Sequence, residues 1–441
     1  MIKFVMIIFF MCLMMMFNKK IMYYYNLCFL ISFFFLFKYM FKDGVWVSIS
    51  LSYGFDFYSY NLLLLSFWII GLMFMVIQLE KMSVVKSLMF LVMMMILIIF
   101  FLSMNLLLFY FMFELSLIPV FMLIIYWGLN FERLSASFYL LLYTMFVSLP
   151  LLVYIMKMLK LYKTLEMSLM KMGVMNLSVL DYLILFLAFL IKMPIYMFHS
   201  WLPKAHVEAP VYGSMILAAI LLKLGSYGLL RFIDIFLFSS LKYNYLIFSV
   251  GIVGSFIVSL VCLIQVDMKS LVAYSSVVHM NMLMCSVYTM TKLGFMSSYI
   301  LMISHGLCSS ALFFMVNLYY ERSLSRLMFL NKGMMSIYPS LSVWWFGFCV
   351  INFSFPFSLN FISELLLIMV IISFDIILMI YIMLVCFFSS VYSLYLYSYI
   401  QHGQVYSENN KKFYVIYLSD YLILIVHMVP LVLMIFNLVL F

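Results

Sequence analysis

The sequence predicts an all-α membrane protein of about fourteen transmembrane helices, because apolar runs of about 20 residues fill it and lack the alternation of barrel strands. Of its 441 residues, 69% are hydrophobic and 9% are charged, and the mean hydropathy is +1.23. A water-soluble protein does not reach such values. Lipid offers no hydrogen bonds to the backbone, so these runs must satisfy their own as helices. We therefore expect one transmembrane domain over residues 1–441.

Polar and charged residues divide the apolar runs into the expected spans. The run from Ser87 to Leu129 is too long for one crossing at about 1.5 Å per residue, so we divide it near Asn105. Met1 to Phe17 lacks the cleavage site of a signal peptide, and we expect a retained first helix. Loop Lys and Arg residues divide almost equally between the two faces and do not orient the chain. The expected spans are residues 4–17, 22–40, 60–78, 87–104, 106–128, 136–156, 181–203, 211–232, 244–264, 270–289, 295–319, 341–372, 375–400 and 420–440.

Composition and motifs exclude several classes of function. The formal charge of +9 is spread over connecting segments instead of forming one basic patch, which argues against a nucleic-acid partner. The seven cysteines lie singly in apolar runs, so we expect neither disulfides nor zinc or iron–sulfur ligands. There is no GxGxxG after a strand, no Walker loop and no histidine pair spaced to bind two haems. We expect no cofactor, no metal, no quinone site and no electron transfer in this chain.

Two of the expected spans, the seventh and the twelfth, are interrupted by a proline in comparable surroundings. Pro194 and Pro356 each remove a backbone hydrogen bond inside an apolar run, and each lies a few residues from a charged group. A freed carbonyl at membrane depth is tolerated only where protein or water replaces the bond, so both breaks should line an interior cavity. Their matching positions predict discontinuous helices in an inverted repeat, in which residues 87–232 (helices 4–8) correspond to residues 244–400 (helices 9–13).

Four ionisable residues of the apolar spans are hard to place at a membrane surface: Glu114, Lys192, Lys223 and Glu364. At a helix centre each costs about 2.5–3.5 kcal/mol on insertion scales, so a function or strong mutual pairing must offset the cost. Lys192 lies about ten residues from either end of its span, too deep for its stem to reach the interface. It is either a structural ion pair with Glu114 or a proton-handling group, and intramembrane ionisable residues favour the second.

Each of the other three ionisable residues also has a structural interpretation and a functional one. Glu114 in "FYFMFELSLIP" has no local partner, and either makes an interhelical hydrogen bond as a protonated acid or modulates the charge of Lys192. Lys223 lies nearer a helix end and either extends to the interface or relays protons. Glu364, about two turns after Pro356, is either a simple polar contact or the terminal acid of a proton path.

Two histidines join this set. A single helical histidine is more often a satisfied core group, but His279 and His305 both fall in spans rich in small residues, which permit close packing and bound water. Imidazole is the side chain best suited to pass protons near pH 7. The buried Glu, Lys and His residues on successive helices therefore predict a polar axis near the membrane midplane, along which protons move through water.

Four segments carry a resemblance to a known family. These are "KMPIYMFHSWLPKAHVEAPVYGSMILAAILLKLGSYGLLR" (192–231), "QVDMKSLVAYSSVVHM" (265–280), "ISHGLCSSALFF" (303–314) and "FELSLIP" (113–119). They closely resemble the antiporter-like (Mrp-type) membrane subunits of mitochondrial NADH:ubiquinone oxidoreductase, respiratory complex I, and among them the chain 4 family. The resemblance runs from the fourth to the twelfth expected helix, and the first segment is long and highly specific.

The resemblance implies a fourteen-helix subunit with two inverted five-helix repeats in the membrane arm of the complex. It implies proton translocation across the mitochondrial inner membrane, driven by electron transfer from NADH to ubiquinone in other subunits, which hold the NADH, FMN, iron–sulfur and ubiquinone sites. The implied partners are neighbouring antiporter-like subunits, other membrane-arm subunits and phospholipids. The implied proton-path residues are the Glu114 and Lys192 charge pair, the midplane Lys223, the connecting His279 and His305, and the helix-twelve acid Glu364.

Some positions depart from the family pattern. Met197 and Phe198 replace a smaller pair, Tyr212 stands where Ser or Ala is usual, and Ser226 replaces a usual Gly. The twelfth span keeps one proline, Pro356, where the family often has two. The sequence has no long lateral helix after its last span, which favours chain 4 over its larger relative.

Two alternatives to the proton-translocating subunit remain at this stage. The chain is a stand-alone cation/proton antiporter if the purified chain couples sodium flux to proton flux in liposomes. It is a scaffold without transport if replacing Lys192 with Met leaves proton pumping by the assembled complex intact.

Overall fold

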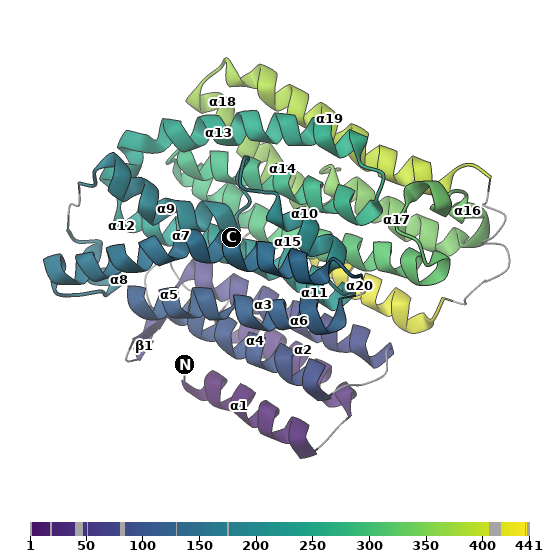
Figure 1. Ribbon diagram of the computed structural model, residues 1–441, viewed down its shortest axis with the longest axis horizontal. Helices are drawn as coiled ribbons and strands as arrows, with labels where there is room; N and C mark the ends of the chain where they lie inside the picture. The colour runs from purple at the N-terminus through teal and green to yellow at the C-terminus, as the bar shows by residue number, and fades with distance from the viewer. Residues whose placement is uncertain are drawn as a thin grey trace. The chain divides into compact units, whose positions relative to one another are not determined.

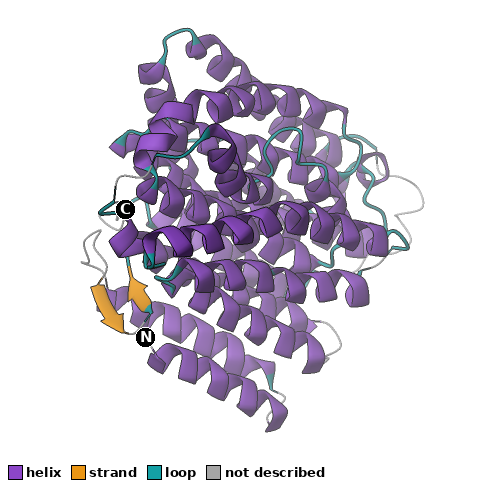
Figure 2. Ribbon diagram, turned by 60° about the vertical axis from the view of Figure 1, so that its left-hand side comes forward, coloured by secondary structure: helices purple, strands orange, loops and turns teal. Residues whose placement is uncertain are grey.

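The computed structural model describes residues 2–17, 20–39, 47–50, 52–79, 84–128, 130–173, 176–404, 416–436 and 438. Helices make up nearly all of the regular structure in these ranges, and the two strands form one antiparallel hairpin (Figure 2). Nine helical segments of the described chain are long and apolar enough to cross a membrane. The chain is therefore a mostly helical, multi-pass membrane protein, as its composition predicts.

The nine long segments coincide with nine of the expected spans. Residue 40 of the expected span 22–40, and residues 437, 439 and 440 of the expected span 420–440, lie outside the described residues. The nine segments are Phe57–Gln78, Val84–Leu102, Leu106–Trp127, Arg133–Tyr162, Val211–Ile235, Leu237–Ile264, Met268–Tyr288, Lys292–Ser323 and Leu378–Gln401.

The chain forms two compact units, and the first contains residues 1–192 and 208–243 (Figure 1). In this unit α9 packs against α7 and α12, and α5 packs against α4, α6 and α7. Its elements are α1 (Ile2–Phe17), α2 (Ile21–Tyr39), β1 (Val47–Ser50), β2 (Tyr53–Phe55), α3 (Phe57–Leu79), α4 (Val84–Leu102), α5 (Leu106–Leu115), α6 (Leu117–Trp127), α7 (Arg133–Tyr162), α8 (Met167–Met170), α9 (Val179–Lys192), α11 (Val211–Ile216), the π-helical turn η1 (Leu217–Leu221) and α12 (Leu222–Ile235).

The second unit contains residues 193–207 and 244–439. In it α14, α15 and α18 pack against one another, and α15 also packs against α17 and α20. Its elements are α10 (Trp201–Glu208), most of α13 (Leu237–Ile264), α14 (Met268–Tyr288), α15 (Lys292–Ser323), the 3-10 turn η2 (Met328–Asn331), α16 (Met334–Ile337), α17 (Pro339–Asn352), α18 (Leu359–Phe374), α19 (Leu378–Gln401) and α20 (Leu418–Leu433).

The division expected near Asn105 is confirmed. Helix α4 ends at Leu102, and the side chain of Asn105 accepts a hydrogen bond of 3.0 Å from the backbone N–H of Leu107. An asparagine that accepts from the second helical residue is a favoured N-cap, because the first backbone N–H groups of a helix lack internal partners. Asn105 thus starts the helix that carries Glu114.

The span expected at 106–128 consists of two helices, α5 and α6, which meet at Ser116. Pro119 lacks a backbone N–H and cannot bond the carbonyl four residues earlier, which weakens the helix at this point. The hydroxyl of Ser116 donates a hydrogen bond of 2.7 Å to the carbonyl of Phe113. The break places Glu114 next to the end of α5.

The seventh and twelfth expected spans, which contain Pro194 and Pro356, are discontinuous. The chain is non-helical between α9 and α10, around Pro194, and again between α17 and α18, around Pro356. Five residues after the last helical residue of α9 and of α17, the backbone adopts a positive φ, 79° at Met197 and 71° at Phe357. These bulky residues rarely adopt that conformation, so its recurrence at equivalent points shows that the two breaks share a local backbone pattern.

One side chain compensates for the second break. The amide of Asn360, on the first turn of α18, donates a hydrogen bond of 2.9 Å to the carbonyl of Ile351 at the end of α17. Helix ends leave carbonyls without internal partners, and at membrane depth such groups must be satisfied by protein or water. Asn360 therefore ties the two halves of the interrupted helix together.

Candidate functional site

Lys192 is the last residue of α9, and its side chain is buried, with 3% of the residue exposed. Its ammonium donates a hydrogen bond of 2.6 Å to the carbonyl of Phe113 on α5, and it lies 3.2 Å from the centre of the Phe113 ring. The negative end of a helix dipole favours a cation in the last turn, and aromatic faces attract ammonium groups. A positive charge is thus accommodated in an apolar region, with no direct ion pair to a carboxylate among the residues that the structure describes.

Glu114 follows Phe113 on α5, and its carboxylate interacts electrostatically with the Lys192 ammonium. Neither carboxylate oxygen has a hydrogen-bond partner in the described part of the chain, although both oxygens are buried. Ser148 lies beside the carboxylate, but its hydroxyl donates to the carbonyl of Met145 at 3.3 Å. The expected charge pair therefore lies together, with its two members separated by more than a direct ion-pair contact.

Lys223 is fully buried on the first turn of α12. Its ammonium donates a hydrogen bond of 2.7 Å to the carbonyl of Ala218, which lies in the π-helical turn η1. A π turn inserts one residue into the helix, changes the local hydrogen-bond ladder and is frequent at functional sites. The side chain turns back along its own helix, which does not fit the alternative in which Lys223 extends to the interface.

Three expected residues meet in the second unit. The Nδ1 atom of His279 on α14 lies 3.2 Å from Oε1 of Glu364 on α18, and the side chains are 7% and 16% exposed. The ring of His305 on α15 lies 5.5 Å from the His279 ring, centre to centre. The hydroxyl of Ser354 donates a hydrogen bond to Oε2 of Glu364. An acid and two imidazoles on three helices thus form one polar cluster.

A small cavity of about 20 Å³ borders this cluster. His279 and Glu364 line it together with Cys386 and Ser389 of α19 and a set of aliphatic side chains. A cavity above about 10–15 Å³ can hold a water molecule where it offers polar partners, and this wall supplies a carboxylate, an imidazole and a hydroxyl. The cluster can therefore exchange protons with a water molecule as well as within itself.

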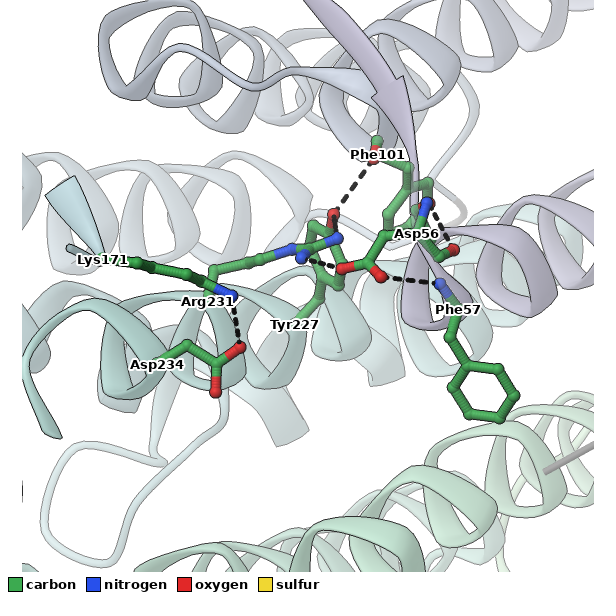
Figure 3. Close-up of polar contacts among 8 residues, drawn as sticks. Asp56, Phe57, Phe101, Lys171, Tyr227, Arg231 and Asp234 are labelled. Atoms are coloured by element: carbon green, nitrogen blue, oxygen red, sulfur yellow. Dashed lines mark hydrogen bonds and ion pairs between the residues drawn. The ribbon is translucent and has the colours of Figure 1, made fainter. Parts of the chain in front are cut away.

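The sequence did not predict a buried ion-pair network in the first unit (Figure 3). The guanidinium of Arg231, on α12, pairs with the carboxylate of Asp56 just before α3, and 1% and 5% of the two side chains are exposed. Arg231 also donates to the hydroxyl of Tyr227 at 2.7 Å, which donates to the carbonyl of Phe101 at 3.0 Å. Arg231 lies eight residues after Lys223 in an apolar span. A second cation at that spacing in the same span was the sequence feature that could have indicated a buried ion pair.

A second ion pair, also missed, lies in the second unit. Arg322 at the end of α15 approaches Asp420 in the first turn of α20, with 3.3 Å between guanidinium nitrogen and carboxylate oxygen. Asp420 also accepts a hydrogen bond of 3.3 Å from the backbone N–H of Tyr417, so it caps α20 as well. Both side chains are buried. This pair fixes the start of the last helix and shares no residue with the His279 cluster.

Two family models match the chain and together cover most of it. Residues 1–105 match the amino-terminal region described as NADH-ubiquinone oxidoreductase chain 4. Residues 103–390 match the transmembrane region described as NADH:quinone oxidoreductase/Mrp antiporter. The second match contains all six residues singled out from the sequence.

Similar proteins extend over nearly the whole chain. It is 44% identical to NADH-ubiquinone oxidoreductase chain 4 of Aedes aegypti, with 99% of this chain and 98% of that protein covered. It is 46% identical to the corresponding chain 4 of Ceratitis capitata, with 87% and 86% covered. It is 40% identical to that of Myxine glutinosa, with 71% and 70% covered.

Solved structures share the fold. A chain of respiratory complex I from Thermus thermophilus with bound NADH has a TM-score of 0.83 at 21% identity, and the match covers 93% of this chain and 89% of that chain. A chain of the membrane-bound sulfane sulfur reductase, an archaeal respiratory membrane complex, has a TM-score of 0.82 at 18% identity, with 91% and 69% covered. At these identities the likeness shows the fold alone.

Proposed function

Because the chain belongs to the NADH-ubiquinone oxidoreductase chain 4 family, we propose that its buried Glu, Lys and His side chains carry protons across the mitochondrial inner membrane. The chain is a proton-translocating membrane-arm subunit of respiratory complex I, the H+-translocating NADH:ubiquinone reductase. Electron transfer from NADH to ubiquinone, with its FMN and iron–sulfur clusters, takes place in other subunits. The free energy released by that electron transfer acts on this chain by changing the positions of the groups around its buried charged side chains.

The position of the Lys192 ammonium carries the proposal. It rests on the Phe113 carbonyl at 2.6 Å, while the neighbouring Glu114 carboxylate has no hydrogen-bond partner in the described chain. A small shift that brings the carboxylate to the ammonium stabilises the charged lysine, and the reverse shift releases its proton. Hydrogen bonds to charged groups are worth about 1.5–3 kcal/mol. Moving one charge against 100 mV requires about 2.3 kcal/mol, so one such change is sufficient for one step.

The other groups proposed to carry protons are Lys223 in the first unit and His305, His279 and Glu364 in the second. Each is a titratable group in an apolar region with a defined neighbour. Lys223 donates a hydrogen bond to the Ala218 carbonyl. His279 lies between His305 and Glu364. Intramembrane ionisable groups of this kind mark proton relays, and imidazole titrates close to physiological pH.

We propose that the chain crosses the membrane fourteen times within one domain. The nine long segments account for most crossings, and the remaining expected spans coincide with α1, α2, the interrupted pairs α9–α10 and α17–α18, and α20. The shared pattern at the two breaks supports an inverted repeat of residues 87–232 and 244–400, because each break falls in the fourth helix of its repeat.

The proposed partners are other complex I membrane-arm subunits, including neighbouring antiporter-like subunits, and phospholipids. Apolar side chains on long helices support contact with lipid or with other subunits. Phe146 and Val153 of α7 are 82% and 70% exposed, and Ile380 of α19 is 65% exposed. Large apolar side chains exposed to this extent along long helices are stable in a bilayer or against another chain, and not in water. Nucleic acid is not among the proposed partners.

Proton pumping by the assembled complex tests the proposal. Lys192→Met removes the buried ammonium, and Lys157→Met removes a lysine whose side chain is 54% exposed on α7. We expect NADH-driven proton uptake into inner-membrane vesicles to fall at least about tenfold with K192M, because the switchable charge is lost, and to stay unchanged with K157M. Normal pumping by assembled K192M complex would reject the proposal and favour a scaffold role.

The stand-alone antiporter is the less favoured function. The similar proteins that match this chain over nearly its full length are chains of NADH-ubiquinone oxidoreductase. Purified chain in liposomes should therefore show no sodium-coupled proton flux in a sodium gradient. Flux of that kind without other subunits would reverse the preference.

A further inference from the structure

Ser354 lies in the break between α17 and α18, where its hydroxyl donates a hydrogen bond to Oε2 of Glu364. Its backbone has a φ of 59°, in the left-handed region. Residues other than glycine rarely adopt this conformation, and it persists where the surrounding structure fixes it. The conformation turns the serine side chain back onto the helix that follows the break. A strained serine thus contacts the acid at the end of the proposed proton path.

On its other side the same carboxylate lies next to an imidazole, although Oε1 has no hydrogen-bond partner among the described residues. Oε1 of Glu364 lies 3.2 Å from Nδ1 of His279, while Oε2 accepts from Ser354. The terminal torsion of a glutamate is broad, so a carboxylate held at one oxygen alone rotates over a wide range. The serine contact restricts this rotation. It keeps one oxygen toward His279 and toward the cavity that Cys386 and Ser389 also line.

We propose that Ser354 is a positioning residue, which holds the Glu364 carboxylate so that Oε1 faces His279 for proton transfer. This inference rests on the proposed function of Glu364 and His279. In the transfer, the proton leaves Nδ1 of a protonated His279 for Oε1, and the imidazole becomes neutral as the carboxyl group does. Donor and acceptor must come within hydrogen-bond reach for this step. The 3.2 Å separation meets the distance condition, and a small rotation of the ring or the carboxylate must complete the alignment, because Oε1 makes no hydrogen bond in the described part of the chain.

The alternative is that Ser354 only sets the backbone conformation of the break between α17 and α18 and does not orient Glu364. Phe357 provides the comparison, because it belongs to the same break, has a φ of 71° and is 81% exposed. Glycine relieves the backbone strain at either position, since it adopts positive φ without a steric cost. Ser354→Gly therefore removes the hydroxyl and eases the break, whereas Phe357→Gly eases the break and leaves the Glu364 contact in place.

The experiment compares S354A, S354G and F357G in the assembled complex, with E364Q as the reference for the acid. NADH-driven proton uptake is measured in inner-membrane vesicles, assembly on native gels, and the carboxylate stretching band of Glu364 by infrared difference spectroscopy, identified by its absence in E364Q. We expect S354A and S354G to assemble, to pump about tenfold more slowly and to shift the carboxylate band. F357G should pump at the parental rate with an unshifted band.

The outcomes separate this inference from the function on which it rests. Parental pumping by S354G, an unshifted carboxylate band, or failure of S354G to assemble while F357G assembles would each overturn the positioning role. If E364Q itself pumps normally, the proposed function of Glu364 fails first. Loss of pumping in E364Q together with normal pumping in both serine variants rejects the role of Ser354 alone.

Discussion

Arg231 and Asp56, 175 residues apart in the sequence, form a buried ion pair in the first unit. The pair ties α12, the helix of Lys223, to the residue that precedes α3, and Tyr227 extends the tie to α4 through the Phe101 carbonyl. The guanidinium and the carboxylate are both buried away from water. Loss of either partner therefore leaves the other charge buried without a compensating charge. The network therefore holds the helix that carries a candidate proton site.

Asp56→Asn should destabilise the chain strongly. The variant leaves the Arg231 guanidinium buried without a carboxylate, which costs about 3–5 kcal/mol in the free energy of unfolding. The melting temperature of the purified complex and the amount of assembled complex measure the effect.

The surface pair of Lys171 and Asp234 is the matched control. Its atoms lie 3.0 Å apart, but the side chains are 33% and 32% exposed. Asp234→Asn should cost less than about 1 kcal/mol, because solvent screens such a pair. Equal destabilisation by D56N and D234N would show that burial does not decide the contribution of the Arg231 pair.

Gly228→Ala tests the contact between α9 and α12. A Cβ atom at Gly228 would lie 2.3 Å from the Phe189 ring, so the two helices must separate or the ring must move. Overpacking of this kind costs about 1–3 kcal/mol, seen as a lower melting temperature. Gly347→Ala is the control: its nearest atom, Cε of Met428, is 3.5 Å away. That variant should be neutral or slightly stabilising, since alanine favours a helix.

Glu114→Gln should separate proton pumping from assembly. Lys192 donates its hydrogen bond to the Phe113 carbonyl, so loss of the negative charge at residue 114 leaves the ammonium in place and the complex assembles. Pumping should fall at least about tenfold, because glutamine cannot attract the ammonium as a carboxylate does. Proton uptake and native gels on the same vesicles measure both quantities. Parental pumping by E114Q would exclude the carboxylate from the switch.

His279 and Glu364 should behave as a coupled pair. The effects of H279Q and E364Q on pumping should be non-additive by about 0.5–3 kcal/mol when expressed as free energies, because the groups are in contact. His402, an exposed histidine just after α19, supplies the control. H402Q and E364Q should combine additively within about 0.5 kcal/mol. Additivity in the first pair would mean that the observed 3.2 Å contact is not used.

Much of the fold followed from local sequence features. The division near Asn105 and the breaks at Pro194 and Pro356 depend on residues whose effect on the backbone is local, a capping side chain and prolines without an N–H. The break at Ser116 was missed because the apolar run continues unchanged across it. The π turn before Lys223 was also missed, since it depends on the packing of the helix and not on a residue type.

The candidate site was predictable in its members and not in its contacts. Unpaired charges in apolar spans single out Glu114 and Lys192 because lipid makes them costly. Their partners required the fold: a backbone carbonyl, such as that of Phe113, is present at every residue and leaves no mark in the sequence. Ser354 was overlooked for a similar reason, because serine is common in these spans and its contact with Glu364 depends on a strained backbone angle.

The carbonyl that receives the Lys192 ammonium belongs to the main chain at the junction of α5 and α6, where the Ser116 hydroxyl reaches it as well. Substitution can delete an acid, but it cannot delete a peptide oxygen. A substitution at Glu114 therefore changes the acidic partner of this lysine and leaves its hydrogen-bond acceptor in place. Every variant that keeps the path of the main chain at this point also keeps the oxygen that accepts the hydrogen bond of Lys192.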